Sequence, residues 1–434
     1  EYDTDTASSS TNTSSYFDVK RYSSDSSSSI NTEDRIKIGY GSIADEVDTS
    51  SVKQNHCSTM GASVNLVNAM MGTGIIGLPL ALHLCGFWLG LFFSVAIAYI
   101  SCMTMHITIL CGLKTQTCSL VSLCQTLIGR TGSQIVIINS AWGHAAKSIS
   151  TRISKHTLFY KQKQGNLSVR IIMCSLSRST AQFAKWSAMS VFLLMLMLIG
   201  VLVRVPYYLS IVDKIELELV PVSEGMFKGL AIMSLAFGCS QNLFGVYSST
   251  RDQRPSRWLL TCSIAIGIAF VINIVFAVMA YLCFGKHVHA NILLNFPEND
   301  PGIQLVKLAL GLFMVLTIPL CIHPCRESVM MMFGININNP TNKQHYTVTI
   351  GVFALILSIG ATLTSLGKVF DVIGGFSTTI LGFLLPGCAY LYLFSSDLMF
   401  TKGEGSWKLL VISVISILIA LPVMYFSVKD AFFV

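Results

Sequence analysis

The chain has 434 residues, of which 52% are hydrophobic and only 12% are charged. A soluble domain carries about twice that share of charged residues, so the composition excludes a soluble protein and predicts a multi-span membrane protein. The net charge of +7 does not indicate nucleic-acid binding, because the basic residues lie between long apolar runs, where the positive-inside rule places them.

Residues 1–60 form a polar tail rich in Ser, Thr and Asp. Such a segment cannot bury enough apolar surface to offset the entropy lost on ordering, so we expect a disordered, cytosolic tail. Its dense serines are candidate targets for kinases. Tyr16 and Tyr40 each begin a Y-x-x-bulky pattern of the kind that sorting adaptors read. A flexible, unmodified tail is the alternative interpretation.

The first apolar run, residues 61–82, reads GASVNLVNAMMGTGIIGLPLAL and opens the predicted transmembrane domain, residues 61–434. No cleavable signal pattern precedes it, so we expect it to be both the first span and its own targeting signal. Gly72, Gly74 and Gly77 crowd its middle and Pro79 follows, which weakens a helix interior. In lipid a broken helix is tolerated only where it faces protein or a cavity, and broken helices near the midplane are typical of secondary transporters. The alternative, a Gly-rich packing face, does not need these residues clustered on one turn.

The same residues carry a resemblance. The pattern N-x-x-N-x-M-x-G-T-G-I-x-x-L-P resembles the first helix of the amino acid/auxin permease family. It comprises Asn65, Asn68, Met70, Gly72, Thr73, Gly74, Ile75, Leu78 and Pro79. The motif is long, and it is far more specific than a lone glycine triplet.

A second span is expected over about residues 86–111, but residues 143–185 are irregular. They contain eight Lys and Arg residues between Lys147 and Lys185 and no apolar run long enough to cross a bilayer. The family that the chain resembles has its third and fourth spans here. We therefore expect spans 3 and 4 to be truncated or irregular, through a true variant or a gene-model error, and sequencing of the transcript distinguishes the two.

Seven further apolar runs predict spans over about residues 186–203, 226–247, 258–284, 303–325, 346–366, 370–394 and 407–426. Arg251, Arg254 and Arg257 follow the second of these runs and mark the cytosolic side. Cys321 and Cys325 are four residues apart, as in some metal sites, but two sulfurs alone do not make a site, so we expect no metal.

A second interruption, Gly238-Cys-Ser-Gln-Asn242, lies in the run over residues 226–247. Polar side chains at membrane depth are costly and are usually functional, although ordinary hydrogen bonding between helices is the alternative. We expect this break and the first one to face each other at the midplane, as in an inverted repeat. Gln241 stands where the resembling family often has a His, which weakens the case for a His-based proton relay.

The resemblance implies an all-α polytopic membrane protein with a leucine-transporter-like inverted repeat of five plus five spans and one further helix. It implies a secondary active transporter that moves amino acids by alternating access, coupled to H⁺ or Na⁺, with no other cofactor and no enzymatic activity. The expected substrate-binding residues are Asn68, Gly72, Thr73, Gly74, Ile75, Cys239, Gln241 and Asn242. The expected coupling-ion residues are Asn65 and Thr317, whose oxygens suit a hard cation or a proton. Thr317 lies in L-T-x-P-L-x-x-x-P-x-R-E, which resembles the family's eighth helix.

Two interpretations stay open. The resemblance includes vacuolar or lysosomal members and sodium-coupled neutral amino acid transporters, and we expect a vacuolar or lysosomal membrane rather than the plasma membrane. A non-transporting amino acid sensor, or an inactive variant with damaged spans 3 and 4, is the alternative to a transporter.

Overall fold

A computed structural model describes residues 57–72, 74–141, 180–211, 224–297, 300–335, 340–362, 371–399 and 406–433. These residues are helical with short connections, and no strand occurs among them. Within them, six helices are long and apolar enough to cross a membrane, and seven when one bent helix pair is taken as a single span. These findings confirm, for the described residues, the all-α architecture that the resemblance implied and the several membrane-crossing helices that the composition predicted.

The bent pair is the first apolar run. Helix α2 (Thr59–Met70) begins at Ser58, whose hydroxyl accepts a hydrogen bond from the Gly61 N–H at 3.2 Å. It ends at Met71, which turns to extended backbone, and α3 (Gly74–Cys85) then begins with its axis at 68° to α2. Pro79 lies in the second turn of α3, where its missing N–H leaves the Ile75 carbonyl without its usual helical partner. The predicted break in the first span is thus present.

A tight turn at Gly86 connects α3 to α4 (Phe87–Thr115). The φ of Gly86 is +78°, a value that residues with a side chain rarely adopt. After α4 comes α5 (Leu120–Ile128), whose first turn is closed by a capping box in which the Ser119 hydroxyl accepts from the Ser122 N–H at 3.0 Å. Residues 130–141 are again helical. Residues 120–141, which precede the irregular stretch, therefore form short helices.

The second interruption divides the run over residues 226–247 as predicted. Helix α9 (Gly225–Ala236) stops at Phe237, a single 3-10 turn η1 (Ser240–Asn242) follows, and α10 (Leu243–Ser249) completes the segment.

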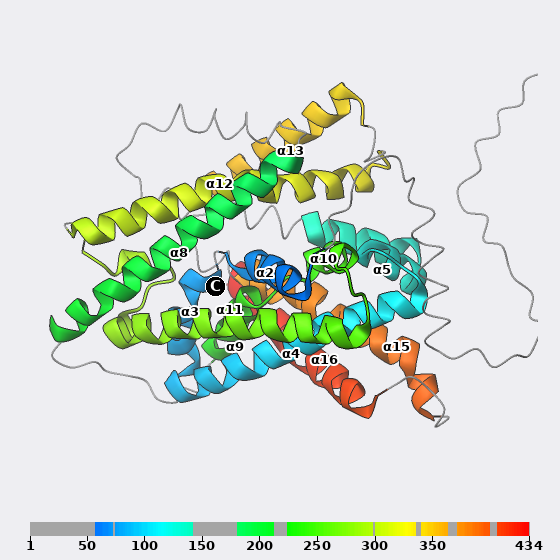
Figure 1. The fold of residues 1–434 in the computed structure, drawn as a ribbon, viewed down its shortest axis with the longest axis horizontal. Helices are drawn as coiled ribbons and strands as arrows, with labels where there is room; N and C mark the ends of the chain where they lie inside the picture. Colours follow the sequence, from blue (N-terminus) through cyan, green and yellow to red (C-terminus); the bar gives the residue numbers. More distant parts are fainter. Residues whose placement is uncertain are drawn as a thin grey trace, which may run out of the picture. The chain divides into compact units, whose positions relative to one another are not determined.

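Four further helices are each longer than 20 residues. They are α8 (Thr180–Ile211), α11 (Pro255–Phe284), α12 (Pro301–Met332) and α13 (Asn342–Thr362), with 3-10 turns η2 (Gly285–His287) and η3 (Ile292–Leu294) between α11 and α12. Pro255 and Pro301 occupy the first helical positions, where a missing N–H costs nothing. Helices α8 and α12 lie side by side (Figure 1) and run antiparallel, since Gly200 abuts Val306 and Arg204 pairs with Asp300.

The first half of the predicted span over residues 370–394 is wound as a π-helix. The span comprises η4 (Asp371–Thr378), η5 (Ile380–Leu384) and α15 (Leu385–Met399), and α16 (Trp407–Phe433) follows. The Thr379 hydroxyl donates to the Gly374 carbonyl, five residues earlier, at 2.7 Å. Such wide turns are rare and occur often at functional sites.

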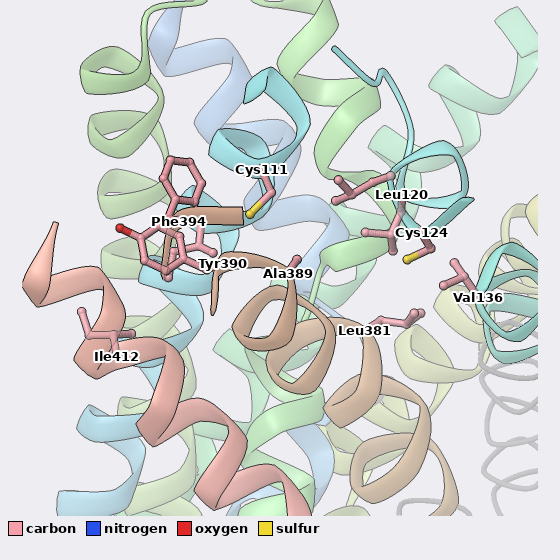
Figure 2. Close-up of a cluster of buried hydrophobic side chains, with 11 residues drawn as sticks. Cys111, Leu120, Cys124, Val136, Leu381, Ala389, Tyr390, Phe394 and Ile412 are labelled. Atoms are coloured by element: carbon pink, nitrogen blue, oxygen red, sulfur yellow. The ribbon is translucent and has the colours of Figure 1, made fainter. Parts of the chain in front are cut away.

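A buried apolar cluster joins the short helices of residues 120–141 to α4 and to the later spans (Figure 2). Leu120 and Cys124 of α5 and Val136 meet side chains of α4, η5, α15 and α16, including Cys111, Leu381, Ala389, Tyr390, Phe394 and Ile412. Each fully buried large apolar side chain stabilises the fold by about 1.5–3 kcal/mol relative to exposure to water, but much less relative to lipid. The short helices after α4 are therefore part of the packed body.

Some predicted boundaries shift and some predictions fall elsewhere. Helix α2 begins at Thr59 rather than at residue 61, and α8 begins at Thr180, so the last residues of the 143–185 stretch are helical. Residues 142–179, most of the polar tail and Thr73 lie outside the described residues. The predicted disorder of the tail and the predicted truncation of span 4 stay predictions.

Candidate functional site

The two broken spans meet at their breaks. A Cβ atom placed on Gly74, the first residue of α3, would lie 3.0 Å from both the Cα and the N of Ala236, the last residue of α9. At the other end of the same helices, a Cβ on Gly229 would lie 3.0 Å from the Ala81 carbonyl oxygen and would overlap Cys85 Sγ. Helices α3 and α9 therefore run antiparallel in close contact, with a glycine at each end of the contact.

The outer ends of the two broken spans are also joined. The Cys57 N–H donates to the Ser249 carbonyl at 2.8 Å, and the Arg251 N–H donates to the Cys57 carbonyl at 3.0 Å. These bonds form an isolated bridge between the residue that precedes α2 and the end of α10. The two discontinuous spans are thus held together at the breaks and at one end.

The breaks expose backbone groups of opposite polarity. The first N–H groups of a helix and its last carbonyl groups lack partners within the helix. At the start of α3 the Ile75 N–H donates to the Gly72 carbonyl at a long 3.3 Å. The N-terminus of α3 therefore favours an anion such as a carboxylate, while the C-termini of α2 and α9 favour a cation.

The π-helical span packs directly on the second break. A Cβ on Gly238 would overlap Thr378 Cγ2 and lie 2.9 Å from the Ser234 carbonyl oxygen. A Cβ on Gly374 would overlap the Ala231 carbonyl group, and one on Gly375 would overlap the Ser427 side chain of α16. Three glycines thus let η4 approach α9 and α16 closely, as small residues do in membrane bundles, and at Gly374 the two backbones are in direct contact.

The predicted substrate-binding residues lie around these breaks with different exposure. Gly74, Ile75 and Cys239 are buried, Asn68, Gly72 and Gln241 are half-buried, and Asn242 is exposed. Cys239 Sγ lies 3.8 Å from Met105 Sδ of α4, and the Asn242 N–H donates to the Cys239 carbonyl at 3.0 Å. The structure brings Gly74 to the α9 side of the second break; Thr73 falls outside the described residues.

The two predicted coupling-ion residues are less well defined. Asn65 is exposed on α2, and its amide nitrogen lies 3.8 Å from Cys57 Sγ. Thr317 lies on α12, and its side chain is outside the described residues. Within the part of the chain that is described, His, Cys, Asp and Glu side chains do not gather in groups of three or more.

Sequence reasoning missed two polar side chains near the breaks. The Ser63 hydroxyl of α2 donates to the Thr261 carbonyl of α11 at 3.0 Å, which ties the first span to the seventh. Asn273 of α11 donates from its amide nitrogen to the Ala236 carbonyl at 3.4 Å. Asn273 has the only carboxamide in the apolar run over residues 258–284, a signal that was present in the sequence.

An all-helical membrane protein in which two discontinuous helices meet at their breaks has the architecture of a secondary transporter. The comparisons with known proteins define the class more closely. The family described as "Transmembrane amino acid transporter protein" matches residues 55–119 and 110–430. The chain belongs to this family, which confirms the predicted resemblance, and the match also runs through the irregular middle of the chain.

Relatives support the same assignment. The chain is 24% identical over 399 residues to "Putative sodium-coupled neutral amino acid transporter 11" of Danio rerio, covering 87% of this chain and 88% of the relative. It is 23% identical to "Vacuolar amino acid transporter 2" of Saccharomyces cerevisiae, covering 80% and 77% of the two chains. It is 24% identical to "Vacuolar amino acid transporter 5" of Schizosaccharomyces pombe, covering 79% and 86%. The relatives are named as transporters, so the chain is a transporter-family protein and not an enzyme.

The fold also matches a solved structure. The crystal structure of MhsT in complex with L-phenylalanine superimposes with a TM-score of 0.56 at 11% identity, over 87% of this chain and 100% of MhsT. At that identity the match concerns the fold alone. This chain therefore shares the overall fold of MhsT.

Proposed function

We propose that this chain is a secondary active transporter that moves amino acids across a membrane by alternating access, coupled to H⁺ or Na⁺. The observation that carries the proposal is the contact of the two breaks at Gly74 and Ala236. Membership of the amino acid transporter family and the names of the relatives support an amino acid as substrate.

The substrate's two charges fit the two polarities of the breaks. In the proposed binding mode the carboxylate accepts hydrogen bonds from the N–H groups of residues 72–75 at the start of α3. The ammonium lies near the carbonyl groups at the ends of α2 and α9, and Asn68, Cys239, Gln241 and Asn242 border the substrate. Gly74 is buried between the backbones, so its N–H is held in place by packing rather than by a flexible side chain.

The fold suggests how the site is presented to each side in turn. We propose a leucine-transporter-like inverted repeat, supported by the antiparallel contact of α3 and α9, in which the two discontinuous spans move relative to the surrounding helices. Asn65 and Thr317 are the proposed ligands of the coupling ion. The relatives include both sodium-coupled and vacuolar proteins by name, so an experiment must identify the coupling ion. For the membrane, we propose the vacuolar or lysosomal membrane, with the N-terminus on the cytosolic side.

Uptake in proteoliposomes tests the proposal. The full chain is reconstituted, and uptake of a mixture of labelled neutral L-amino acids is measured under a pH gradient alone and under a sodium gradient alone. We expect uptake under at least one gradient. Binding of amino acids without uptake under either gradient would support the non-transporting sensor instead, and neither binding nor uptake would indicate an inactive variant.

Two glycine variants locate the site. Gly74→Val forces the α3 and α9 backbones apart, so we expect it to abolish uptake while the protein still inserts into the membrane. Gly267→Val in α11 is the matched control, because a Cβ at Gly267 meets no atom within 4 Å, and it should transport normally. Normal uptake by Gly74→Val would remove the first span from the site.

A further inference from the structure

One buried amide reaches the second break and keeps an unused acceptor. Asn273 of α11 is only 2% exposed, and its amide nitrogen donates to the Ala236 carbonyl oxygen at 3.4 Å. Ala236 is the last residue of α9, so its carbonyl belongs to the turn that the break leaves without helical partners. Asn273 thus supplies one hydrogen bond that an unbroken helix would have supplied itself.

The other amide atom, Asn273 Oδ1, has no hydrogen-bond partner although it is buried. The orientation of the amide is fixed by chemistry, because a carbonyl oxygen only accepts hydrogen bonds and the NH₂ group must therefore face Ala236. Leaving a buried acceptor unsatisfied costs about 1–3 kcal/mol. A donor that arrives from outside the protein recovers that free energy.

This acceptor lies beside the contact between the two breaks. Helix α3 begins at Gly74, which packs against Ala236. Because Asn273 donates to the Ala236 carbonyl, it lies where the two breaks meet. One turn earlier on α11, the Phe270 ring stacks near the Phe237 ring with centroids 6.2 Å apart. Helix α11 therefore forms one side of the second break.

We propose that Asn273 contacts the transported amino acid directly, its Oδ1 accepting a hydrogen bond from the substrate's α-ammonium group. This inference rests on the proposed function. The start of α3 offers donors for the carboxylate, whereas an acceptor is needed at the opposite pole of the substrate, and Asn273 Oδ1 is a buried acceptor beside the break. An ammonium donor makes a charge-assisted bond, which is stronger than a neutral one.

The test compares an amino acid with its 2-hydroxy acid, which has the same carboxylate and side chain but no ammonium. Competition of L-leucine and L-2-hydroxyisocaproate against the uptake of labelled neutral amino acids is measured for the full chain in proteoliposomes. Asn273→Leu keeps the side-chain size and removes the acceptor, so we expect the apparent affinity for leucine to fall about tenfold or more. The affinity for the hydroxy acid should fall less, because its hydroxyl group donates only a neutral hydrogen bond. Asn273→Asp keeps an acceptor and adds a negative charge that attracts the ammonium, so the preference for the amino acid over the hydroxy acid should increase.

Asn291→Leu is the matched control. Asn291 is 3% exposed, also has one unpaired amide atom, and lies in the turn before α12, where its Oδ1 accepts from the Leu293 N–H at 3.2 Å. Asn291→Leu should lower the amount of folded protein without changing the preference for leucine over the hydroxy acid. If Asn273→Leu does not fold, Asn273→Asp alone decides, because a purely structural role predicts an unchanged or reduced preference.

Three results would overturn the inference. They are an unchanged preference in Asn273→Leu, an equal loss of both competitors in Asn273→Leu and Asn273→Asp, and a shift in the sodium concentration needed for uptake with no change in preference. Failure of the proposed function is distinct, because it appears as the absence of uptake by the unmodified chain.

Discussion

Asn139 and Ser377 exchange two hydrogen bonds across 238 residues of sequence. The Asn139 amide nitrogen donates to the Ser377 carbonyl at 3.2 Å, and the Ser377 hydroxyl donates to the Asn139 carbonyl at 3.0 Å. Both residues are buried, at 5% and 1% exposure. The helix over residues 130–141 is therefore docked on the π-helical span, within one turn of Gly374 and Gly375, which pack on α9 and α16.

This docking predicts a local loss of protection when the pair is broken. Ser377→Ala removes one of the two bonds, so we expect the amides of residues 130–141 to exchange with deuterium several-fold faster, for a cost of about 0.5–1.5 kcal/mol. Hydrogen exchange measured by mass spectrometry checks this. Ser413→Ala is the control, since the buried Ser413 hydroxyl bonds only within its own helix, to the Leu409 carbonyl at 2.8 Å. Equal exchange in residues 130–141 of the two variants would contradict the docking.

Much of the architecture could be predicted from single residues. The glycines and proline at Gly72–Pro79, and the polar turn at Gly238–Asn242, predicted where the two spans break, because each local signal outweighs the helix preference around it. The position of the first break relative to the second followed from the expectation of an inverted repeat. The structure agrees, since Gly74 contacts Ala236.

Other features depended on tertiary contacts that no local pattern carries. Residues 120–141 lack a long apolar run, yet Leu120 and Val136 are buried because α15 and α16 cover them. The π-helical winding of residues 371–384 depends on the close approach of Gly374 and Gly375 to α9 and α16, which is also not visible in the sequence. Asn273 was overlooked because an isolated polar residue in a span does not reveal which backbone group it reaches.

The close approach of η4 to the second break predicts a steric defect that a second substitution relieves. Gly238→Ala places a methyl group on Thr378 Cγ2 and near the Ser234 carbonyl, so we expect a loss of about 1–3 kcal/mol of stability and most of the uptake. Thr378→Ser removes the opposing methyl group and should restore part of both in the double variant. Melting temperature and uptake rate are the measurements.

Gly245→Ala in α10 provides the comparison for that experiment, because a Cβ at Gly245 meets no atom within 4 Å. It should behave as the unmodified chain. No rescue by Thr378→Ser would show that the contact between Gly238 and Thr378 does not limit the packing of η4 on α9.

The ion pair between α8 and the start of α12 predicts a defined response to acid. Burial raises the pKa of Asp300, but hydrogen bonds from Tyr208, Arg204 and the N–H groups of Gly302 and Ile303 outweigh it and hold the pKa below its ordinary value. A group with a lowered pKa in the folded state contributes stability above its unfolded pKa and loses it as the pH falls through the folded pKa. The cap and ion pair should therefore remain intact at mildly acidic pH.

Asp300→Asn measures this contribution, because Asn still caps α12 but has no charge. We expect it to be less stable than the unmodified chain by about 1 kcal/mol, since Arg204 is partly exposed, with a difference that is constant from pH 8 to pH 5 and shrinks below about pH 4. Glu224→Gln, which breaks the exposed pair with Lys429 at 2.7 Å, should have little effect at any of these pH values. A difference that disappears between pH 7 and pH 5 would show that Asp300 is protonated more easily than its contacts imply.

The coupling ion gives the last prediction. If Asn65 and Thr317 bind Na⁺, Asn65→Ala and Thr317→Ala should each raise the sodium concentration for half-maximal uptake about tenfold, because each removes one oxygen ligand from a cation that needs several. The saturating rate of uptake should change much less, and uptake driven by a pH gradient alone should be absent in the unmodified chain. Proteoliposome assays with sodium varied at fixed pH provide the measurement, and Thr126→Ala, at an exposed hydroxyl that bonds only to the Ser122 carbonyl of its own helix, is the control.

Asn65 is exposed on α2, so its variant is the sharper test: unchanged sodium dependence in Asn65→Ala with altered dependence in Thr317→Ala would leave the first span out of the ion site. Uptake that follows the pH gradient and ignores sodium in all variants would assign the coupling to protons.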